Sequence, residues 1–384
     1  MLIINGKINP VTSLAIENGY IQITDGKIAK IGAMSELNIT EQDTLDAAGG
    51  HVFPGFIDAH CHLGMWEDSL AFEGDDGNES TDPITPHLRA IDGLNPLDKC
   101  FEEARQAGIT TVMTGPGSAN PIGGLFAAIK TAGRRVDDMI LLSPACMKFA
   151  LGENPKSVYN AKNQTPITRM ATAAIIRETL EKAVEYKVKK LSDDPDETPD
   201  FDAKLESLIP LLEKRITAHF HAHRADDIFT AMRIAKEFNL DYVIVHGTQG
   251  HTVADILGQE AAKVIAGPII CDRSKPELSA LTPKGPGLLA AQGVSVAICT
   301  DHPVIPVQYL PLCTALAVKE GMNPDAAIQA VTINAARICN IADRVGSLEP
   351  GKDADIVIHS AHPLDFNSRA QYVLVDGKIV ERLI

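Results

Sequence analysis

The chain has 384 residues, of which 45% are hydrophobic and 22% charged, so it can bury a large core in one large domain with an appendage, or in two domains. Its formal net charge of -15 disfavours nucleic acid and anionic membrane surfaces as partners. No secretory signal or bilayer-spanning apolar run is visible, and seven scattered cysteines without a CxxC motif argue against a disulfide framework, so we expect a cytoplasmic protein.

The first fifty residues are predicted to form short strands joined by Asn-Gly and Asp-Gly turns, and the last thirty-five have the same character. The tetrapeptide Asp-Gly-Lys-Ile occurs at 25–28 and again at 376–379. Two hairpins could share a favoured turn by chance, or the two chain ends could meet in one small β domain with the middle of the chain inserted between them. Composition leaves these alternatives nearly even.

The middle of the chain alternates predicted strands with amphipathic helices, among them helices over 96–108 and 226–238. This alternation predicts a parallel sheet covered by helices, either a (β/α)8 barrel or an open doubly wound sheet. A fourth strand is expected between 151 and 215, where 187–192 is the best candidate. The remaining predicted strands, after an opening one before residue 62, cover 110–115, 139–150, 216–223, 241–247, 262–270 and 294–301.

The stretch "PGFIDAHCHLG" (54–64) places Asp58, His60 and His62 on one face of an extended strand, because alternate side chains point the same way. Two imidazoles behind a carboxylate suit a metal ion better than a dry core.

Three further predicted strands also finish in residues that can bind a metal. In a barrel, functional side chains lie at the carboxyl ends of the strands. Imidazole and carboxylate ligands without thiolate fit Zn, Fe, Mn, Ni or Co. The residues are His219, His221 and His223 on one strand, His246 on the next, and Asp301 at the end of the last.

The motifs "PGFIDAHCHLG", "HAHRADD", "VIVHG", "AICTDHP" and the tail "NAARICNIADRVGSLEPGKDADIVI" together resemble the amidohydrolase superfamily, in its imidazolonepropionase-like and Xaa-Pro dipeptidase-like branch. The resemblance covers nearly the whole chain. It implies a distorted (β/α)8 barrel over 54–345 and a β-sandwich domain composed of 1–53 and 346–384. It also implies one or two divalent ions, zinc first among them, a small-molecule substrate, and a homo-oligomer as an option.

The resemblance further implies that His60, His62, His221, His246 and Asp301 face the metal. By likeness to the family's His-Ala-His pattern, His221 is taken as the ligand, His223 as a substrate or oxyanion contact, and His219 as a deeper residue.

The group that bridges a second ion is left between two alternatives. Many relatives use a carboxylated lysine on the fourth strand, for which Lys187, Lys189 and Lys190 are candidates. Other relatives use a glutamate after the third strand, which favours Glu153 as a metal ligand here.

The expected activity is hydrolysis of a non-peptide or cyclic amide C–N bond in a small molecule. A metal-activated water, whose pKa falls from near 16 to about 7, would attack the carbon, with Asp301 as general base and then general acid. Asp58 is expected to fix imidazole tautomers or to be a buried structural partner. An Xaa-Pro-type dipeptidase is the alternative; a deaminase and an inactive structural homologue are less favoured.

The substrate pocket is expected to include the long acidic segment after the first strand, which carries the only tryptophan, Trp66. The glycine-rich stretch 115–124 is expected to be a rigid loop near the pocket. Arg224, Lys148 and Arg273 could hold a substrate carboxylate, but each is expected to be an ordinary surface cation.

Overall fold

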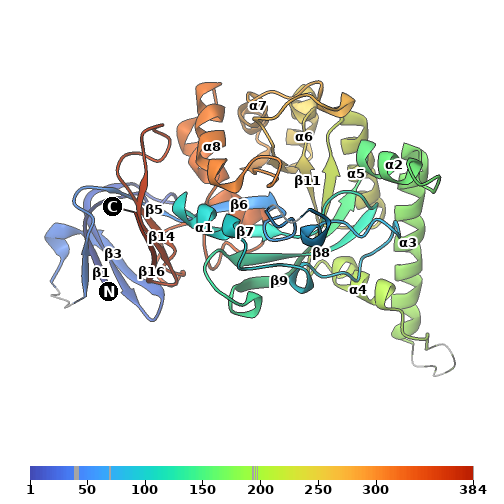
Figure 1. Ribbon diagram of the computed structural model, residues 1–384, viewed down its shortest axis with the longest axis horizontal. Coiled ribbons are helices and arrows are strands. Elements are labelled where there is room, and N and C mark those ends of the chain that lie inside the picture. Colours follow the sequence, from blue (N-terminus) through green and yellow to red (C-terminus); the bar gives the residue numbers. More distant parts are fainter. Residues whose placement is uncertain (39–42, 69–70, 193, 195, 197, 384) are drawn as a thin grey trace.

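The computed structural model describes residues 1–384 apart from 39–42, 69–70, 193, 195, 197 and 384. Its described strands form two eight-stranded sheets. In Figure 1, the blue N-terminal strands and the dark red C-terminal strands lie together at one end of the molecule, and the middle of the chain forms the rest.

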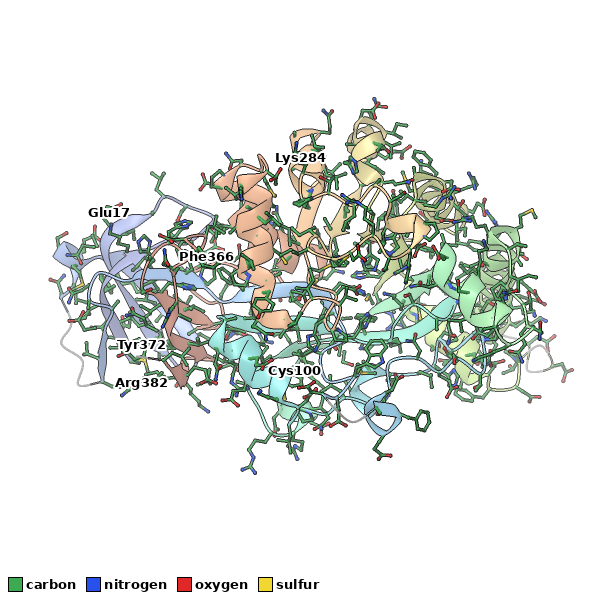
Figure 2. All side chains as sticks on the ribbon, turned by 45° about the horizontal axis from the view of Figure 1, so that its top comes forward. Glu17, Cys100, Lys284, Phe366, Tyr372 and Arg382 are labelled. Carbon is green, nitrogen blue, oxygen red and sulfur yellow. The ribbon has the colours of Figure 1, made fainter. Side chains whose placement is uncertain are left out.

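The terminal sheet is built from both ends of the chain, as the resemblance implied. Its strand order is β16-β15-β14-β5-β1-β2-β3, with β4 paired to β1. Tyr372 and Arg382 face each other across its C-terminal hairpin, with the guanidinium 5.6 Å from the ring centre (Figure 2). The strands are β1 (Leu2–Ile8), β2 (Ile16–Thr24), β3 (Lys27–Ala33), β4 (Thr44–Asp46), β5 (His51–Pro54), β14 (Ile356–His359), β15 (Ala370–Val375) and β16 (Lys378–Arg382).

The two Asp-Gly-Lys-Ile segments form the β2–β3 and β15–β16 turns. Asp25, Gly26, Asp376 and Gly377 all have φ between 48° and 76°, the left-handed conformation that a two-residue hairpin turn needs. A Cβ added to Gly26 would lie 3.0 Å from the carbonyl oxygen of Asp376, so the two turns are in contact. The domain boundaries at 53/54 and 345/346 stay predictions.

The second sheet is the wall of a distorted, nearly closed barrel. All its neighbouring strands are parallel except β8, which runs antiparallel to both β7 and β9. Its strands, in spatial and chain order, are β6 (Phe56–Cys61), β7 (Ile109–Thr114), β8 (Ile122–Lys130), β9 (Ile140–Ala150), β10 (Thr217–Ala222), β11 (Tyr242–His246), β12 (Lys263–Ala266) and β13 (Ser295–Ile298).

The strand expected at 187–192 is wrong, because residues up to Lys190 belong to a 22-residue helix, α3 (Arg169–Lys190). Its C-terminal part packs Ala183 and Tyr186 inward, and Lys189 makes an i,i+4 ion pair with Glu185 on its exposed side. The strand that completes the sheet is instead β8, which begins inside the stretch expected to be a glycine-rich loop.

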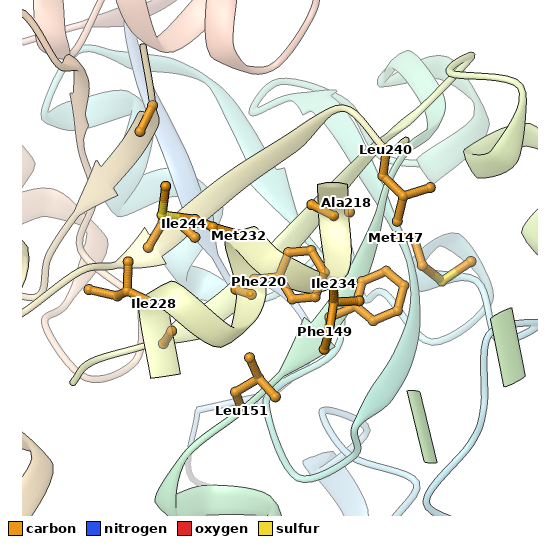
Figure 3. Close-up of a cluster of buried hydrophobic side chains, with 14 of the residues drawn as sticks. Met147, Phe149, Leu151, Ala218, Phe220, Ile228, Met232, Ile234, Leu240 and Ile244 are labelled. Atoms are coloured by element: carbon orange, nitrogen blue, oxygen red, sulfur yellow. The ribbon is translucent and has the colours of Figure 1, made fainter. Parts of the chain in front are cut away.

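Helices surround much of the barrel (Figure 1). A stacked pair, Phe149 of β9 and Phe220 of β10, lies at the centre of the largest cluster, with ring centres 4.8 Å apart (Figure 3). Ile228 and Met232 belong to this cluster and lie in the helix Ala225–Glu237 (α5), where an amphipathic helix was predicted over 226–238. The remaining helices are α1 (Lys99–Gln106), α2 (Glu153–Asn160), α4 (Ala203–Leu212), α5 (Ala225–Glu237), α6 (Ala254–Gln259), α7 (Gly285–Ala291), α8 (Leu310–Lys319), α9 (Pro324–Ala330) and α10 (Ile333–Ile338).

None of the helices in the described part of the chain has the length and apolar character required to cross a membrane.

Candidate metal centre

The histidines and the aspartate that end four barrel strands converge in two neighbouring groups. His60, His62 and Asp301 form one, and His221, His223 and His246 form the other, with the ligand atoms of each group within 4.8 Å of one another. The rings of His60 and His246 are 5.6 Å apart, so the two groups adjoin. Parallel strands bring their carboxyl ends to one edge of a barrel, and this explains the convergence of residues distant in sequence.

The backbone is strained where two of these side chains enter the site. His246 has φ of 75° and Asp301 has φ of 57°, both in the left-handed region that residues with a Cβ seldom adopt. Such strain persists only where the surrounding structure imposes it, and it is concentrated at functional sites.

Burial keeps the imidazoles neutral, which is the form that binds a metal. Desolvation lowers the pKa of His246 to about 4, and it lowers the pKa values of His60, His221 and His223 well below the ordinary value of 6.5. The second cause for His60 is the nearby Lys148, whereas for His221 and His223 it is the neighbouring His246.

Hydrogen bonds to backbone carbonyls fix two of the tautomers. Nδ1 of His62 lies 2.7 Å from the oxygen of Gly115, and Nδ1 of His246 lies 2.7 Å from the oxygen of Gly267. A carbonyl only accepts, so Nδ1 carries the proton in both rings and Nε2 keeps its lone pair for a metal.

Nδ1 of His60 and Nδ1 of His221 are among the imidazole nitrogens buried without a partner in the described part of the chain. Buried polar atoms without hydrogen bonds are rare and costly. Neutral imidazoles with free lone pairs, next to a carboxylate, fit a divalent transition-metal ion, although they do not select one such ion over another.

Asp301 supplies the carboxylate of the first group. Its Oδ1 lies 3.3 Å from Nε2 of His62 and 3.6 Å from Nε2 of His60. Although burial alone would raise its pKa, His246 and His62 hold that pKa at about 2. The carboxylate is therefore ionised at any physiological pH and available as a ligand or proton acceptor.

Lys148 is the lysine next to the metal-competent histidines, although the sequence had suggested Lys187, Lys189 or Lys190. It points inward from β9, is fully buried, and places Nζ 3.0 Å from Nε2 of His60. Burial lowers its pKa to about 8. The expectation that Lys148 is a surface cation is wrong. The sequence signal for a buried lysine was its position within the apolar run "ACMKFA". In the structure, this lysine is paired with His219 in the register of β9 and β10.

The three lysines suggested by the sequence as bridging groups lie on a helix outside the metal centre. Lys187, Lys189 and Lys190 lie on α3, where they pair with Glu213, Glu185 and Glu206. Their assignment as bridging candidates is wrong, because no strand exists at that position.

Glu153, the predicted alternative, is the first residue of α2 and lines the cavity next to the centre. It belongs to neither ligand group among the described residues. Its backbone N–H donates to Oε2 of Glu277 at 3.0 Å.

Glu277 is a buried carboxylate that sequence analysis did not single out. Its Oε1 has no hydrogen-bond partner in the described part of the chain and lies 3.8 Å from Nε2 of His223. Burial raises the pKa of Glu277. The other ring nitrogen of His223, Nδ1, lies 2.7 Å from the hydroxyl of Thr248. No motif in the sequence identified Glu277 or Thr248 as part of the site.

Asp58 is a structural partner rather than an orienting group for an imidazole ring. Its carboxylate accepts from the hydroxyl of Thr300 at 2.5 Å and from the backbone N–H groups of Thr300 and His60. Burial raises its pKa to about 7. His219 lies deeper in the barrel, fully buried, and burial lowers its pKa to about 3.

A cavity of about 690 Å³ opens over the two ligand groups. Trp66, from the acidic segment after β6, presents its ring edge to face against His62 at 4.9 Å, which fixes that segment at the cavity wall. Arg224 pairs with Asp226 on the surface and Arg273 is exposed, as expected of ordinary cations. Lining residues include His62, Trp66, Asn78, Ser118, Glu153, Asn154, His221, His223, Cys271, Lys275 and Asp301.

Comparison with known proteins places this site in a family. The crystal structure of an amidohydrolase from Thermotoga maritima MSB8 is 42% identical, covers 99% of each chain and has a TM-score of 0.95. Amidohydrolase tasK from Hapsidospora irregularis is 30% identical over 94% of this chain, which spans 39% of that protein.

More distant curated relatives have different activities in their names. Adenine deaminase 2 from Desulfotalea psychrophila is 26% identical over 99% of this chain and 57% of its own length. Imidazolonepropionase from a Geobacillus species is 26% identical over 89% of this chain and 84% of its own length.

The family model for the amidohydrolase family matches residues 51–380, which contain every residue of both ligand groups. The chain belongs to the amidohydrolase family.

Proposed function

We propose that this protein is a metal-dependent hydrolase that cleaves a C–N bond, non-peptide or in a cyclic amide, of a small molecule. The observation that carries the proposal is the convergence of six metal-competent side chains at the floor of a cavity large enough for such a substrate. Seven free cysteines support a reducing, cytoplasmic location as part of the same proposal.

In this proposal, His60, His62, His221, His246 and Asp301 would hold one or two divalent ions. Lys148, whose Nζ lies 3.0 Å from Nε2 of His60, would supply a further ligand after its neutral amine adds CO2 and releases a proton to give a carbamate. A bound divalent ion would supply Lewis acidity, which acidifies water and polarises a carbonyl oxygen.

The chain's own residues would then move the proton. Asp301, ionised and within 3.6 Å of both histidines of its group, accepts the proton of the attacking water. It returns that proton to the leaving nitrogen as the C–N bond breaks, so one carboxylate acts first as base and then as acid. His223, with its Nδ1 held by the hydroxyl of Thr248, donates from Nε2 to the oxygen on which negative charge develops.

Deamination is less well supported by the residues after β10. Asp226 and Asp227 follow His223 where deaminase-like relatives would carry a glutamate, and they pair with Arg224 and Arg169 instead of facing the cavity. An Xaa-Pro-type dipeptidase would use the same metal centre. It differs from the leading proposal only in its substrate, a dipeptide in place of a non-peptide or cyclic amide.

The first test is metal analysis of the purified protein, followed by a screen of N-acyl amino acids, cyclic amides, dipeptides and aminopurines against the zinc- and manganese-loaded forms. We expect one or two transition-metal ions per chain and release of an amine or ring-opened acid. Turnover confined to dipeptides would support the alternative, and ammonia release from aminopurines would replace hydrolysis of an amide by deamination.

Protein that neither retains nor takes up transition metal and turns over no compound would contradict the proposal outright. Size-exclusion chromatography of the same samples would test the predicted homo-oligomer.

A further inference from the structure

Lys275 is a cation in the cavity wall that the proposed chemistry does not use. It is the only lysine or arginine among the described residues that line the 690 Å³ cavity. It lies in the segment between β12 and α7, is partly buried, and begins the short turn that also carries Glu277.

A chain of hydrogen bonds holds the ammonium of Lys275 in place. Its Nζ donates to Oδ1 of Asn154 at 2.6 Å, and Nδ2 of Asn154 donates to the hydroxyl of Ser118 at 2.7 Å. The same Nδ2 lies 3.4 Å from Nε2 of His221. Because Asn154 accepts only one of the three ammonium protons, donors remain for a ligand in the cavity.

The charge of Lys275 is not neutralised by an ion pair with any carboxylate in the described part of the chain. Against the burial that raises it, Lys275 lowers the pKa of Glu277, and Oε2 of Glu277 already accepts a hydrogen bond from the backbone N–H of Glu153. A partly desolvated cation with free donors, and with no described carboxylate within ion-pair distance, is suited to bind an anionic ligand.

The cavity wall also carries apolar side chains, beside the carboxylates of Glu153, Asp272 and Asp301. The apolar residues are Trp66, Ala119, Val158, Leu278, Pro303 and Val304. One carboxylate directed at a lysine and a hydrophobic body against these surfaces would fix a small substrate in one orientation.

We propose that Lys275, positioned by Asn154, binds a carboxylate of the substrate, so that the substrate class is small carboxylic acids whose scissile C–N bond lies a few atoms from that carboxylate. N-acyl amino acids and cyclic amides with a carboxylate side chain are examples. This inference rests on the proposed function, because it names the substrate of the same site.

The test compares pairs of compounds that differ only in the carboxylate. N-acetyl derivatives of leucine, valine, phenylalanine and methionine are each paired with the N-acetyl derivative of the corresponding decarboxylated amine. Binding to the zinc-loaded protein is measured by isothermal titration calorimetry, and turnover is measured separately as acetate release.

Four proteins are compared: the wild type, Lys275→Met, Lys275→Arg and Lys284→Met. Lys284 is an exposed lysine outside the cavity that is close in sequence to Lys275, so its substitution removes the same charge elsewhere (Figure 2). Thermal denaturation of each variant establishes that it is folded.

We expect the wild type and Lys284→Met to prefer the carboxylate of at least one pair by about 10- to 100-fold, which corresponds to a hydrogen bond to a charged group. Lys275→Met should abolish that preference with little change for the amine-derived partner, and Lys275→Arg should restore most of it. If Lys275→Met does not fold, Asn154→Ala tests the same contact with Lys275 retained. We expect this variant to lose the preference for the carboxylate, and a preference equal to that of the wild type would overturn the inference.

The inference is overturned if no carboxylate-bearing compound binds the wild type more tightly than its partner. It is also overturned if the preference persists in Lys275→Met, which would place the carboxylate on the metal ion. Carboxylate-dependent binding without any turnover would support the anion site and contradict the hydrolytic proposal. Equal turnover of both members of each pair would support the hydrolytic proposal and contradict the anion site.

Discussion

Asp301 combines a strained backbone with a charged side chain that contacts two histidines. Its pKa of about 2 means that it is ionised throughout the working pH range, so a change in its protonation would not limit activity there.

We predict that Asp301→Asn keeps the fold but lowers kcat by at least about 100-fold, because proton transfer by a positioned side chain contributes about 10² to 10⁴. Steady-state kinetics of the metal-loaded variant, with circular dichroism as the folding control, measure this. Asp226→Asn, which alters a surface carboxylate paired with Arg224, should have wild-type kcat. Activity close to wild type in Asp301→Asn would remove Asp301 from proton transfer.

The metal content of two variants can distinguish Lys148 from Glu153 as the group that bridges a second ion. Lys148→Met should lower the bound metal by about half or more, because it removes a buried group in contact with His60, whereas Glu153→Gln should leave it unchanged. Both variants are analysed by mass spectrometry for metals after identical loading. The reverse pattern would restore Glu153 as the ligand and exclude Lys148.

The positions of the strand-end residues could be predicted from sequence because two physical rules act together. Side chains alternate along a strand, and parallel strands end at one edge, so His60, His246 and Asp301 were expected to meet. Lys148 and Lys275 could not be found in this way. The first required the register of β9 against β10, and the second lies in an irregular segment whose path no periodicity fixes.

At the scale of elements, Asp58 of β6 joins the first strand of the barrel to the segment that follows its last strand, β13. Its carboxylate accepts hydrogen bonds from the hydroxyl and the backbone N–H of Thr300. Beside it, the backbone N–H of Asp301 donates to the oxygen of His60 at 3.2 Å. The carboxylate therefore closes the ring that positions the metal-binding side chains.

We predict that Asp58→Asn lowers the free energy of unfolding by about 2 to 4 kcal/mol, because it leaves buried N–H donors of Thr300 and His60 facing an amide. Thr300→Val should cost about 1 kcal/mol, since only the hydroxyl is lost. Urea denaturation monitored by circular dichroism measures both. Equal, small losses would show that this contact does not close the barrel.

Two elements were predicted wrongly for one physical reason. The segment 187–192 and β8 were assigned from local composition, but 187–190 continue the helix whose residues Ala183 and Tyr186 are buried, while Val188 and Leu191 stay exposed. Likewise Ile122–Lys130, fully buried on both faces between β7 and β9, lacks the alternation that identifies a strand in sequence.

At the scale of the whole molecule, a buried charge network joins the barrel to the terminal sheet. Lys130, at the end of β8, places Nζ 3.0 Å from Asp353, 2.6 Å from Asp355 and 3.3 Å from Asp376. Asp353 also pairs with Lys27 and Arg344. Lys27 of the N-terminal segment and Lys130 of the barrel thus share one carboxylate of the C-terminal segment, Asp353.

Although burial alone would raise it, Arg344, Lys27 and Lys130 lower the pKa of Asp353 well below its ordinary value of 3.8. The stabilisation from ionised Asp353 is then fully present above about pH 4 and is lost as the pH falls through its folded pKa. We predict that Asp353→Asn costs about 3 to 5 kcal/mol near neutral pH, and that the deficit shrinks below about pH 4.

Guanidinium denaturation from about pH 7 to about pH 3 measures this deficit. Asp241→Asn serves as the control, because Asp241 is exposed and pairs only loosely with Lys214 at 3.9 Å. A deficit independent of pH, or no deficit at all, would mean that the network does not couple the two parts of the molecule.

The contact between Trp66 and His62 has a practical consequence. Trp66 is the only tryptophan in the chain, and its indole ring lies 4.9 Å from an imidazole of the proposed centre. An open-shell ion such as cobalt or copper held by His62 would quench indole emission at so short a range, whereas zinc would leave it bright. The unlabelled protein therefore contains its own optical reporter, by which ion exchange and the entry of small molecules can be followed before any reaction has been assigned.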